Sequence, residues 1–328
     1  MALYDKITSG EGTILLDGEV GGFIRCLCPE ECDTKLVPAS VCWERPSVIR
    51  EVHLKYIAAG ANIITTNTYA TVRARLAKEL GAPERWEEAV KTSLSMAKEA
   101  RSESGKDVLI AGSLPPLAGS YRPDNVGLYD DILKTYREHV AVMAEHVDLF
   151  LCETMTTGEE ARAAATAAKE SGKPVWISWN CKEDGAATLR SGETLQQAWD
   201  KVADLKPEAA LVNCVTPETV SVAVPQLKRL GARFCGGYGN AFSAIPEGWT
   251  NKKAGIGALG ERTDMTPEAY ADFVARWREA GASIVGGCCK VGPDHISKLR
   301  QHIDDPERPA KAARKEDPSS ETAEEGKA

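Results

Sequence analysis

The stretch ASIVGGCC, residues 282–289, is an apolar run that stops at two glycines and continues into two adjacent cysteines. The run predicts a buried strand, and the glycines allow the backbone to leave strand geometry at its end. In a continuing strand neighbouring side chains point to opposite faces, whereas at a broken end both thiols can face one point. A second apolar run, residues 209–213, leads into Cys214. These two stretches predict strands whose ends bring three thiols together.

Three thiolates at strand ends are typical of an open Zn²⁺ site, in which the protein fills three tetrahedral positions and leaves the fourth to a substrate. Cys214, Cys288 and Cys289 are therefore candidate metal ligands and catalytic residues. The spacing alone leaves two other interpretations open. Cys288 and Cys289 would then be two small buried core residues, or would close a vicinal disulfide.

Short apolar runs alternate along the whole chain with longer helical patterns, as expected for a parallel sheet. Eight strand-helix units predict an α/β fold, a (β/α)8 TIM barrel, whose chemistry lies at the C-terminal ends of the strands. The expected strands are residues 13–16, 62–66, 108–111, 148–152, 175–179, 209–213, 233–237 and 283–286. The expected helices are residues 46–59, 83–103, 129–146, 158–171, 194–205, 217–230, 267–280 and 293–303.

The composition is that of one soluble domain. We expect the barrel at residues 1–309 and a disordered tail at residues 310–328, where few large apolar groups are available to bury. The chain has no apolar stretch of membrane-spanning length and no secretory pattern at its N-terminus. We therefore expect a cytoplasmic protein with reduced cysteines and no membrane partner. The net charge of −8 argues against a nucleic-acid partner, and the sequence leaves a homo-oligomer open.

Five separated motifs, in order between about residues 10 and 302, resemble the homocysteine S-methyltransferase family. VNC at 212–214 and GGCCKVGPDHI at 286–296 resemble its two zinc motifs. The other matches are LDG at 16–18, residues 52–61 with TTNTY at 65–69, and Glu153-Thr154. The resemblance implies a TIM barrel that binds Zn²⁺ through the three cysteines and transfers a methyl group to the thiol of homocysteine, giving methionine.

The resemblance also implies roles for residues outside the zinc motifs. Asp17 and Gly18 match a loop in which an aspartate and backbone groups hold the amino acid substrate. Glu153 matches the glutamate that receives the amino group of homocysteine. The structural alternative for Glu153 is a salt bridge to a neighbouring helix, because a carboxylate at the end of a buried strand needs a partner.

Further candidates lie on the loops of the same rim. Trp43 matches a tryptophan that contacts the methyl donor, although a tryptophan is as often a core residue. Asn240 is expected to orient a zinc ligand or the substrate. Residues 112–116 with Tyr121 are expected to shape the donor side. Polar side chains at the end of the second expected strand are expected to face substrate, namely Asn67, Thr68 and Tyr69.

Two departures from the family bear on the methyl donor. Glu19 stands where relatives carry a small residue, and Thr154 stands where betaine-dependent relatives carry a tyrosine. A carboxylate at position 19 that points inward favours a donor with a sulfonium and an ammonium group. The length also leaves no room for the pterin and corrinoid modules of folate-dependent relatives. We therefore expect S-methylmethionine or a similar sulfonium, with a betaine-type donor or another thiol acceptor as alternatives.

Two other classes of function and a second metal site stay open. The barrel would then be an unrelated zinc or redox enzyme, or a non-catalytic zinc- and thiol-binding barrel, although a pure metal binder has no use for Glu153. Cys26, Cys28 and Cys32, with Cys42 further on, either chelate a second metal or are loop and packing thiols. We expect this segment to be an irregular loop.

Overall fold

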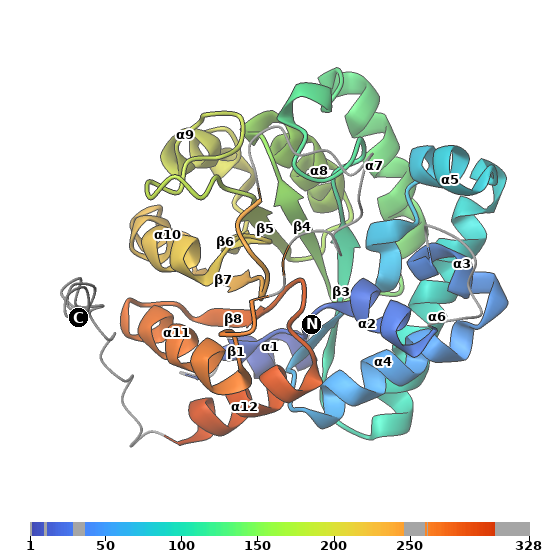
Figure 1. Ribbon diagram of the computed structural model, residues 1–328. Helices are drawn as coiled ribbons and strands as arrows, with labels where there is room; N and C mark the ends of the chain where they lie inside the picture. Colours follow the sequence, from blue (N-terminus) through green and yellow to red (C-terminus); the bar gives the residue numbers. More distant parts are fainter. Residues whose placement is uncertain (1, 10–11, 29–36, 246–259, 261, 306–328) are drawn as a thin grey trace, which may run out of the picture.

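The computed structural model describes residues 2–9, 12–28, 37–245, 260 and 262–305, and the expected disordered tail lies outside these residues. Eight parallel strands form a ring with helices around it, so the prediction of an α/β TIM barrel is confirmed (Figure 1). The strands are β1 Ile14–Leu15, β2 Ile63–Thr65, β3 Leu109–Leu114, β4 Leu149–Met155, β5 Val175–Trp179, β6 Ala209–Asn213, β7 Phe234–Gly239 and β8 Ile284–Gly287.

From β2 to β8 each strand pairs with the next in the chain, and β8 pairs with β1. The ring closes between β1 and β2 through a parallel bridge from Leu16 to Ile63. Two backbone hydrogen bonds support this seam, from Asn62 N to Leu15 O at 2.7 Å and from Asp17 N to Ile63 O at 3.0 Å. Because all strands run the same way, their C-terminal ends lie on one rim.

Helices cover the outside of the ring. The α-helices are α1 Ala2–Thr8, α2 Val20–Leu27, α3 Val37–Glu44, α4 Pro46–Ala58, α5 Arg73–Leu80, α6 Trp86–Ser104, α7 Tyr129–Met143, α8 Gly158–Glu170, α9 Leu195–Asp200, α10 Pro217–Arg229, α11 Pro267–Glu279 and α12 Pro293–Asp304. Short 3-10 helices are η1 Asn67–Ala70, η2 Pro83–Arg85, η3 Pro123–Asn125 and η4 Ala203–Leu205. The expected helix at 83–103 is thus divided into η2 and α6, and that at 194–205 into α9 and η4.

The first unit of the barrel differs from the prediction. The segment around Cys26 was expected to be an irregular loop, but residues 20–27 form α2 and residues 37–44 form α3. Gly22 suits this helix because a Cβ there would lie 2.0 Å from Glu19 Cδ, so the missing side chain makes room for Glu19. The two adjacent glycines give this short segment a low helix propensity, so its sequence does not predict a helix. The helix is stabilised by packing of the buried Ile24 against the core.

The barrel has two apolar layers. The outer one lies between the strands and the helices, and the inner one fills the ring with side chains such as Leu109, Leu151, Trp176 and Leu211. Both faces of each strand are buried, which explains why the strands read as continuous apolar runs. The ring is therefore a filled core, and the open surface available for chemistry is at its rim.

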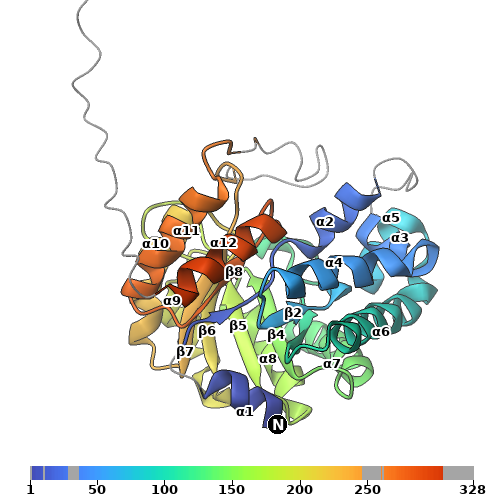
Figure 2. The ribbon, with the colours of Figure 1, turned by 90° about the horizontal axis from the view of Figure 1, so that it is seen from below.

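Helix α1 lies across the N-terminal mouth of the barrel and is not indicated by any pattern in the sequence (Figure 2). Its Tyr4 hydroxyl accepts a hydrogen bond from Trp176 Nε1 at 3.0 Å and donates one to Glu208 Oε2 at 2.9 Å. These contacts close the end of the barrel opposite the three thiols. A seven-residue helix has too few turns to show a periodic pattern, so only its packing reveals it.

No helix in the described part of the chain combines the length and apolar character needed to cross a lipid bilayer.

A tight contact between β7 and β8 gives a test of the barrel geometry. A Cβ added at Gly236 would lie 1.8 Å from the Ile284 carbonyl oxygen, whereas Gly12 has open space around it. We expect Gly236→Ala to lower the free energy of unfolding by about 1–3 kcal/mol, because the two strands must separate to admit the methyl group. Gly12→Ala is the matched control. Equal thermal midpoints for the two variants in calorimetry would contradict the described β7–β8 register.

Candidate active site

The three thiols predicted from the sequence meet at the C-terminal rim. The sulfur atoms of Cys214, Cys288 and Cys289 all lie within 4.8 Å of one another. Cys214 Sγ is 3.7 Å from Cys289 Sγ, and the sulfurs of Cys288 and Cys289 are 4.0 Å apart. All three cysteines are free, and Cys288 is half-buried while the other two are buried. This arrangement suits a metal that prefers sulfur ligands, with an open side at Cys288.

Cys214 is held in an unusual backbone conformation directly after β6. Its φ is 57°, in the left-handed region that non-glycine residues adopt at a cost. Its carbonyl accepts a hydrogen bond from Asn180 Nδ2 at 2.9 Å, and its sulfur lies 2.8 Å from the Tyr121 hydroxyl. Hydrogen bonds from Cys288 and Cys289, with smaller contributions from Tyr121 and Asn240, hold the pKa of the Cys214 thiol well below its ordinary value. Among the three thiols, that of Cys214 is therefore the one that loses its proton most readily.

The positions of Cys288 and Cys289 follow from the end of β8 at Gly287. A Cβ at Gly287 would lie 2.0 Å from Val291 Cγ1, so the turn after the cysteines can pack against this position only if it is glycine. Cys289 N donates to Asn240 Oδ1 at 3.1 Å, so Asn240 lies beside a predicted ligand, and its role in orienting that ligand stays a prediction. The buried Asn240 amide also contributes to the lowered pKa of the Cys214 thiol, so this side chain lies against two of the three cysteines.

Glu153 lies on β4, at the same rim, and is 7% exposed. Its carboxylate accepts hydrogen bonds from Ser113 Oγ at 2.5 Å and from Tyr238 Oη at 3.2 Å. Burial raises its pKa to about 7, against the opposing effect of these two hydrogen bonds. The alternative of a salt bridge to a helix finds no support, since no ion pair found among the described residues includes Glu153. A buried carboxylate without a cation attracts a cationic ligand.

The first loop ties the rim together. Both Asp17 oxygens accept from Thr65, Oδ2 from its N–H at 2.7 Å and Oδ1 from its hydroxyl at 2.9 Å, and burial raises the pKa of Asp17 to about 8. Gly18 is required where a Cβ would lie 2.1 Å from Val291 O. Glu19 Oε2 accepts from Lys290 N at 2.7 Å, directly after the two cysteines, and burial raises its pKa. Asp17 and Glu19 therefore also connect the first loop to the end of β2 and to the turn after the two cysteines.

The other residues predicted to contact substrate make contacts with neighbouring segments of the chain. Asn67 Nδ2 donates to Pro38 O at 2.5 Å, and the Thr68 hydroxyl donates to Ser113 O at 2.8 Å. The Tyr69 hydroxyl lies 2.6 Å from Ser120 Oγ. Trp43 belongs to α3, packs against the outer core and has the Arg85 guanidinium 4.2 Å from its ring centroid. A substrate role for these four residues stays a prediction. For Trp43 to contact the methyl donor, the Arg85 guanidinium would have to leave the face of its ring.

The second metal site is not supported by the described residues, among which the only group of suitable side chains is that of Cys214, Cys288 and Cys289. Cys26 is exposed on α2, while Cys28 is buried. The buried Cys42 thiol bonds to Ser93 Oγ at 3.4 Å, and burial raises its pKa to about 11. Cys32 lies outside the described residues. The described thiols of this segment are packing or surface groups.

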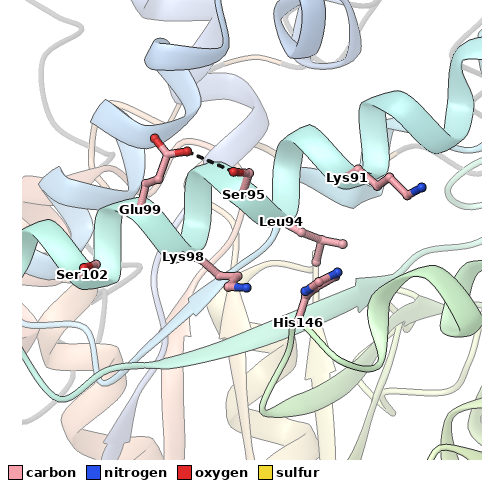
Figure 3. A pocket seen from close by; sticks show the side chains of 7 residues that line it. All are labelled: Lys91, Leu94, Ser95, Lys98, Glu99, Ser102 and His146. Atoms are coloured by element: carbon pink, nitrogen blue, oxygen red, sulfur yellow. Dashed lines mark hydrogen bonds between the residues drawn. The ribbon is translucent and has the colours of Figure 1, made fainter.

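A shallow pocket of about 400 Å³ lies on the outer surface of the barrel, between α6 and the loop before β4 (Figure 3). Lys98 and His146 face each other across it, and none of the rim residues lines it. It is separate from the thiols, so it does not compete with them as the candidate active site.

The tertiary structure adds residues to which the sequence analysis gave no role or a different one. Tyr121 was expected on the donor side, yet its hydroxyl contacts Cys214. Phe242 and Ile245 form an apolar wall against the same thiols. Asn180 holds the backbone of Cys214, and its only signal in the sequence is a polar residue directly after an apolar strand.

The chain is similar to known methyltransferases over most of its length. Residues 14–303 match the family described as homocysteine S-methyltransferase. The chain is 30% identical to homocysteine S-methyltransferase 3 of Arabidopsis thaliana, in an alignment that covers 79% of this chain and 81% of that protein. It is 28% identical to a selenocysteine methyltransferase of Astragalus bisulcatus, in an alignment that covers 82% of this chain and 86% of that protein. The fold matches the metallated form of the homocysteine methyltransferase MmuM from Escherichia coli with a TM-score of 0.74 and 26% identity, covering 92% of this chain and 98% of that one.

We expect Cys214→Ala, Cys288→Ala and Cys289→Ala each to abolish tight metal binding, because two thiolates leave the tetrahedral set incomplete. Bound metal per chain, measured by mass spectrometry after gel filtration, checks this. Cys235→Ala is the control, since Cys235 is a buried thiol at the opposite end of β7. Full metal content in any of the three rim variants would show that the cluster is not the metal site.

Proposed function

Because this chain belongs to the homocysteine S-methyltransferase family and is a methyltransferase, we propose that it transfers a methyl group from an onium donor to the thiol of homocysteine at a Zn²⁺ site, giving methionine. Cys214, Cys288 and Cys289 hold the metal in this proposal. The observation that carries it is the convergence of these three thiols beside a buried carboxylate, that of Glu153, which lacks a cation.

The spacing of the sulfurs supports zinc as the metal. Ligands at a Zn–S distance of ~2.3 Å in a tetrahedron lie about 3.8 Å from one another. The Cys214–Cys289 and Cys288–Cys289 sulfur separations, 3.7 Å and 4.0 Å, fall on either side of this value, and the third pair of sulfurs lies within 4.8 Å. When bound, Zn²⁺ keeps an added thiol in its deprotonated, nucleophilic form at neutral pH.

Glu153 holds the amino group of homocysteine in this proposal. Its carboxylate is already fixed by Ser113 and Tyr238, so little reorientation is needed on binding. The added ammonium would return the pKa of Glu153 toward its ordinary range, because an opposite charge favours the ionised form. Binding is thus linked to the charge of a single buried group.

Methyl transfer is then an in-line displacement at the donor methyl carbon. A new bond forms between the homocysteine sulfur and the methyl group, and the bond from that carbon to the onium sulfur or nitrogen breaks. The bonding electrons remain on the leaving group, which becomes a neutral thioether or amine, so no general acid is required. The residues of the chain contribute by aligning the two substrates, and Phe242 and Ile245 limit water at the thiols.

We infer a sulfonium donor such as S-methylmethionine, with betaine-type donors second. Three carboxylates lie on this rim, those of Asp17, Glu19 and Glu153, and they favour a donor that presents cationic groups. The relative from Astragalus bisulcatus is named for selenocysteine, so selenocysteine is the alternative acceptor to assay beside homocysteine.

We expect Glu19→Gln to reduce the ratio of kcat/KM for S-methylmethionine to that for betaine by several-fold. Glutamine can still accept the hydrogen bond from Lys290 N, so the variant removes the negative charge while keeping the contact. Steady-state rates with both donors at fixed homocysteine provide the measurement. An unchanged ratio would show that Glu19 acts only on the loop.

We expect the KM for homocysteine to rise as the pH falls from 8 to 6, because Glu153 becomes protonated through its raised pKa of about 7 and loses the charge that binds ammonium. Glu153→Gln should raise this KM by the equivalent of about 2–5 kcal/mol and remove that part of the pH dependence. Metal content should not change.

Glu160→Gln is the matched control for Glu153→Gln. Glu160 is also a buried glutamate whose pKa is raised by burial to about 7, but its carboxylate bonds to Thr156 away from the thiols. If Glu153→Gln altered only the KM of the donor, the amino group of homocysteine would have to bind elsewhere.

A further inference from the structure

A buried ion pair lies beside the thiols, on the loop after β5. Arg190 Nη2 donates to Glu183 Oε2 at 3.2 Å, and the two side chains are only 9% and 11% exposed. For comparison, the half-buried pair of Arg101 and Asp148 is 29% and 28% exposed. Burying two charges costs free energy that their attraction often fails to offset, so such a pair is weak evidence for a purely stabilising role.

The other contacts of Arg190 lead to Cys214 by two routes. Its Nε donates to Asn180 Oδ1 at 2.5 Å, and Asn180 Nδ2 in turn donates to the Cys214 carbonyl at 2.9 Å and to the Asn213 carbonyl at 3.1 Å. Its guanidinium also lies 5.0 Å from the ring centroid of Tyr121, whose hydroxyl is 2.8 Å from Cys214 Sγ. One side chain therefore contacts both groups that hold Cys214, one at its backbone and one at its sulfur.

The chemistry of Arg190 determines how Asn180 is oriented. An asparagine amide has an acceptor and a donor end of nearly the same shape, so either end fits the same space. Arginine carries only donors, so it fixes Oδ1 toward itself and leaves Nδ2 for the two backbone carbonyls. A reversed amide would place an oxygen against the Cys214 carbonyl. Cys214 has a φ of 57°, and a strained residue keeps such a conformation only when its surroundings fix it.

We propose that Arg190 is a positioning residue for the metal-binding thiolate of Cys214, acting through the Asn180 amide and the Tyr121 ring. Glu183 holds the guanidinium in place and compensates its charge. The proposal rests on the proposed function only in taking Cys214 as a metal ligand. It extends the site to a loop that contributes no ligand.

The direct test is metal affinity. We expect Arg190→Met to raise the dissociation constant for Zn²⁺ at least about tenfold, as is usual when a group that orients a metal ligand is removed. Competition with a chromophoric chelator measures this constant, and the sulfur-to-metal absorption of the Co²⁺-loaded protein reports the ligand geometry. Arg101→Met is the control, because it breaks a half-buried ion pair without touching the site. Arg190→Met with unchanged affinity and spectrum would overturn the proposal.

A double-mutant cycle tests the route through Asn180. If Arg190 acts through this amide, Arg190→Met should add little to the loss of metal affinity caused by Asn180→Ala. Fully additive losses would contradict the route. A raised KM for a carboxylate-bearing donor with intact metal affinity would instead make Arg190 a donor contact and would likewise overturn the proposal. Failure of the proposed function is distinguishable, since the unmodified protein would then either bind no metal or bind it without methylating homocysteine.

Discussion

The structure depends on one geometric constraint, the convergence of three sulfur atoms that come from two strands that are not neighbours. Cys214 follows β6 and the other two cysteines follow β8, with β7 between them. Because the sheet is parallel, the C-terminal ends of β6 and β8 lie on one rim, and its closure into a ring turns both ends toward the barrel axis. The two strand ends must also bend inward, and the chain achieves this by a left-handed conformation at Cys214 and by glycines at the end of β8. Asn180 holds the first bend by donating to the Cys214 carbonyl, and Asn240 holds the second by accepting from Cys289 N.

A second constraint is electrostatic. The rim collects carboxylates and thiols, and burial raises the pKa of Asp17 to about 8 and that of Glu153 to about 7. Such groups are unfavourable in a closed apolar interior, but they suit the proposed ligands, which are all cationic at the contact point: a metal ion, an ammonium group and an onium methyl. The same charge pattern therefore favours both the proposed metal and the proposed substrates. It also explains why Arg190, next to this rim, is itself compensated by Glu183.

Most of the polar side chains at the rim form hydrogen bonds between loops, in addition to any contact they make with substrates. Asp17 binds Thr65 across the seam between β1 and β2, and Glu19 binds the turn after Cys289. Asn67 and Thr68 connect the second loop to α3 and β3. A site whose parts also support one another is preorganised, so less conformational freedom is lost when the substrates bind. Changes at these positions will therefore affect both positioning and binding.

Local sequence patterns were enough to predict the α/β barrel and the three candidate ligands, because strand-helix alternation and glycine-terminated apolar runs can be recognised without tertiary contacts. They also indicated Glu153, since a carboxylate at the end of a buried strand needs a partner. Only the tertiary structure revealed α1 and α2, which are short or glycine-containing and are held by packing against Trp176 and the outer core. Only the tertiary structure likewise joined Tyr121, Asn180 and Arg190 to Cys214. These residues are far apart in the chain, and the contacts between them depend on distances and orientations that no local pattern encodes.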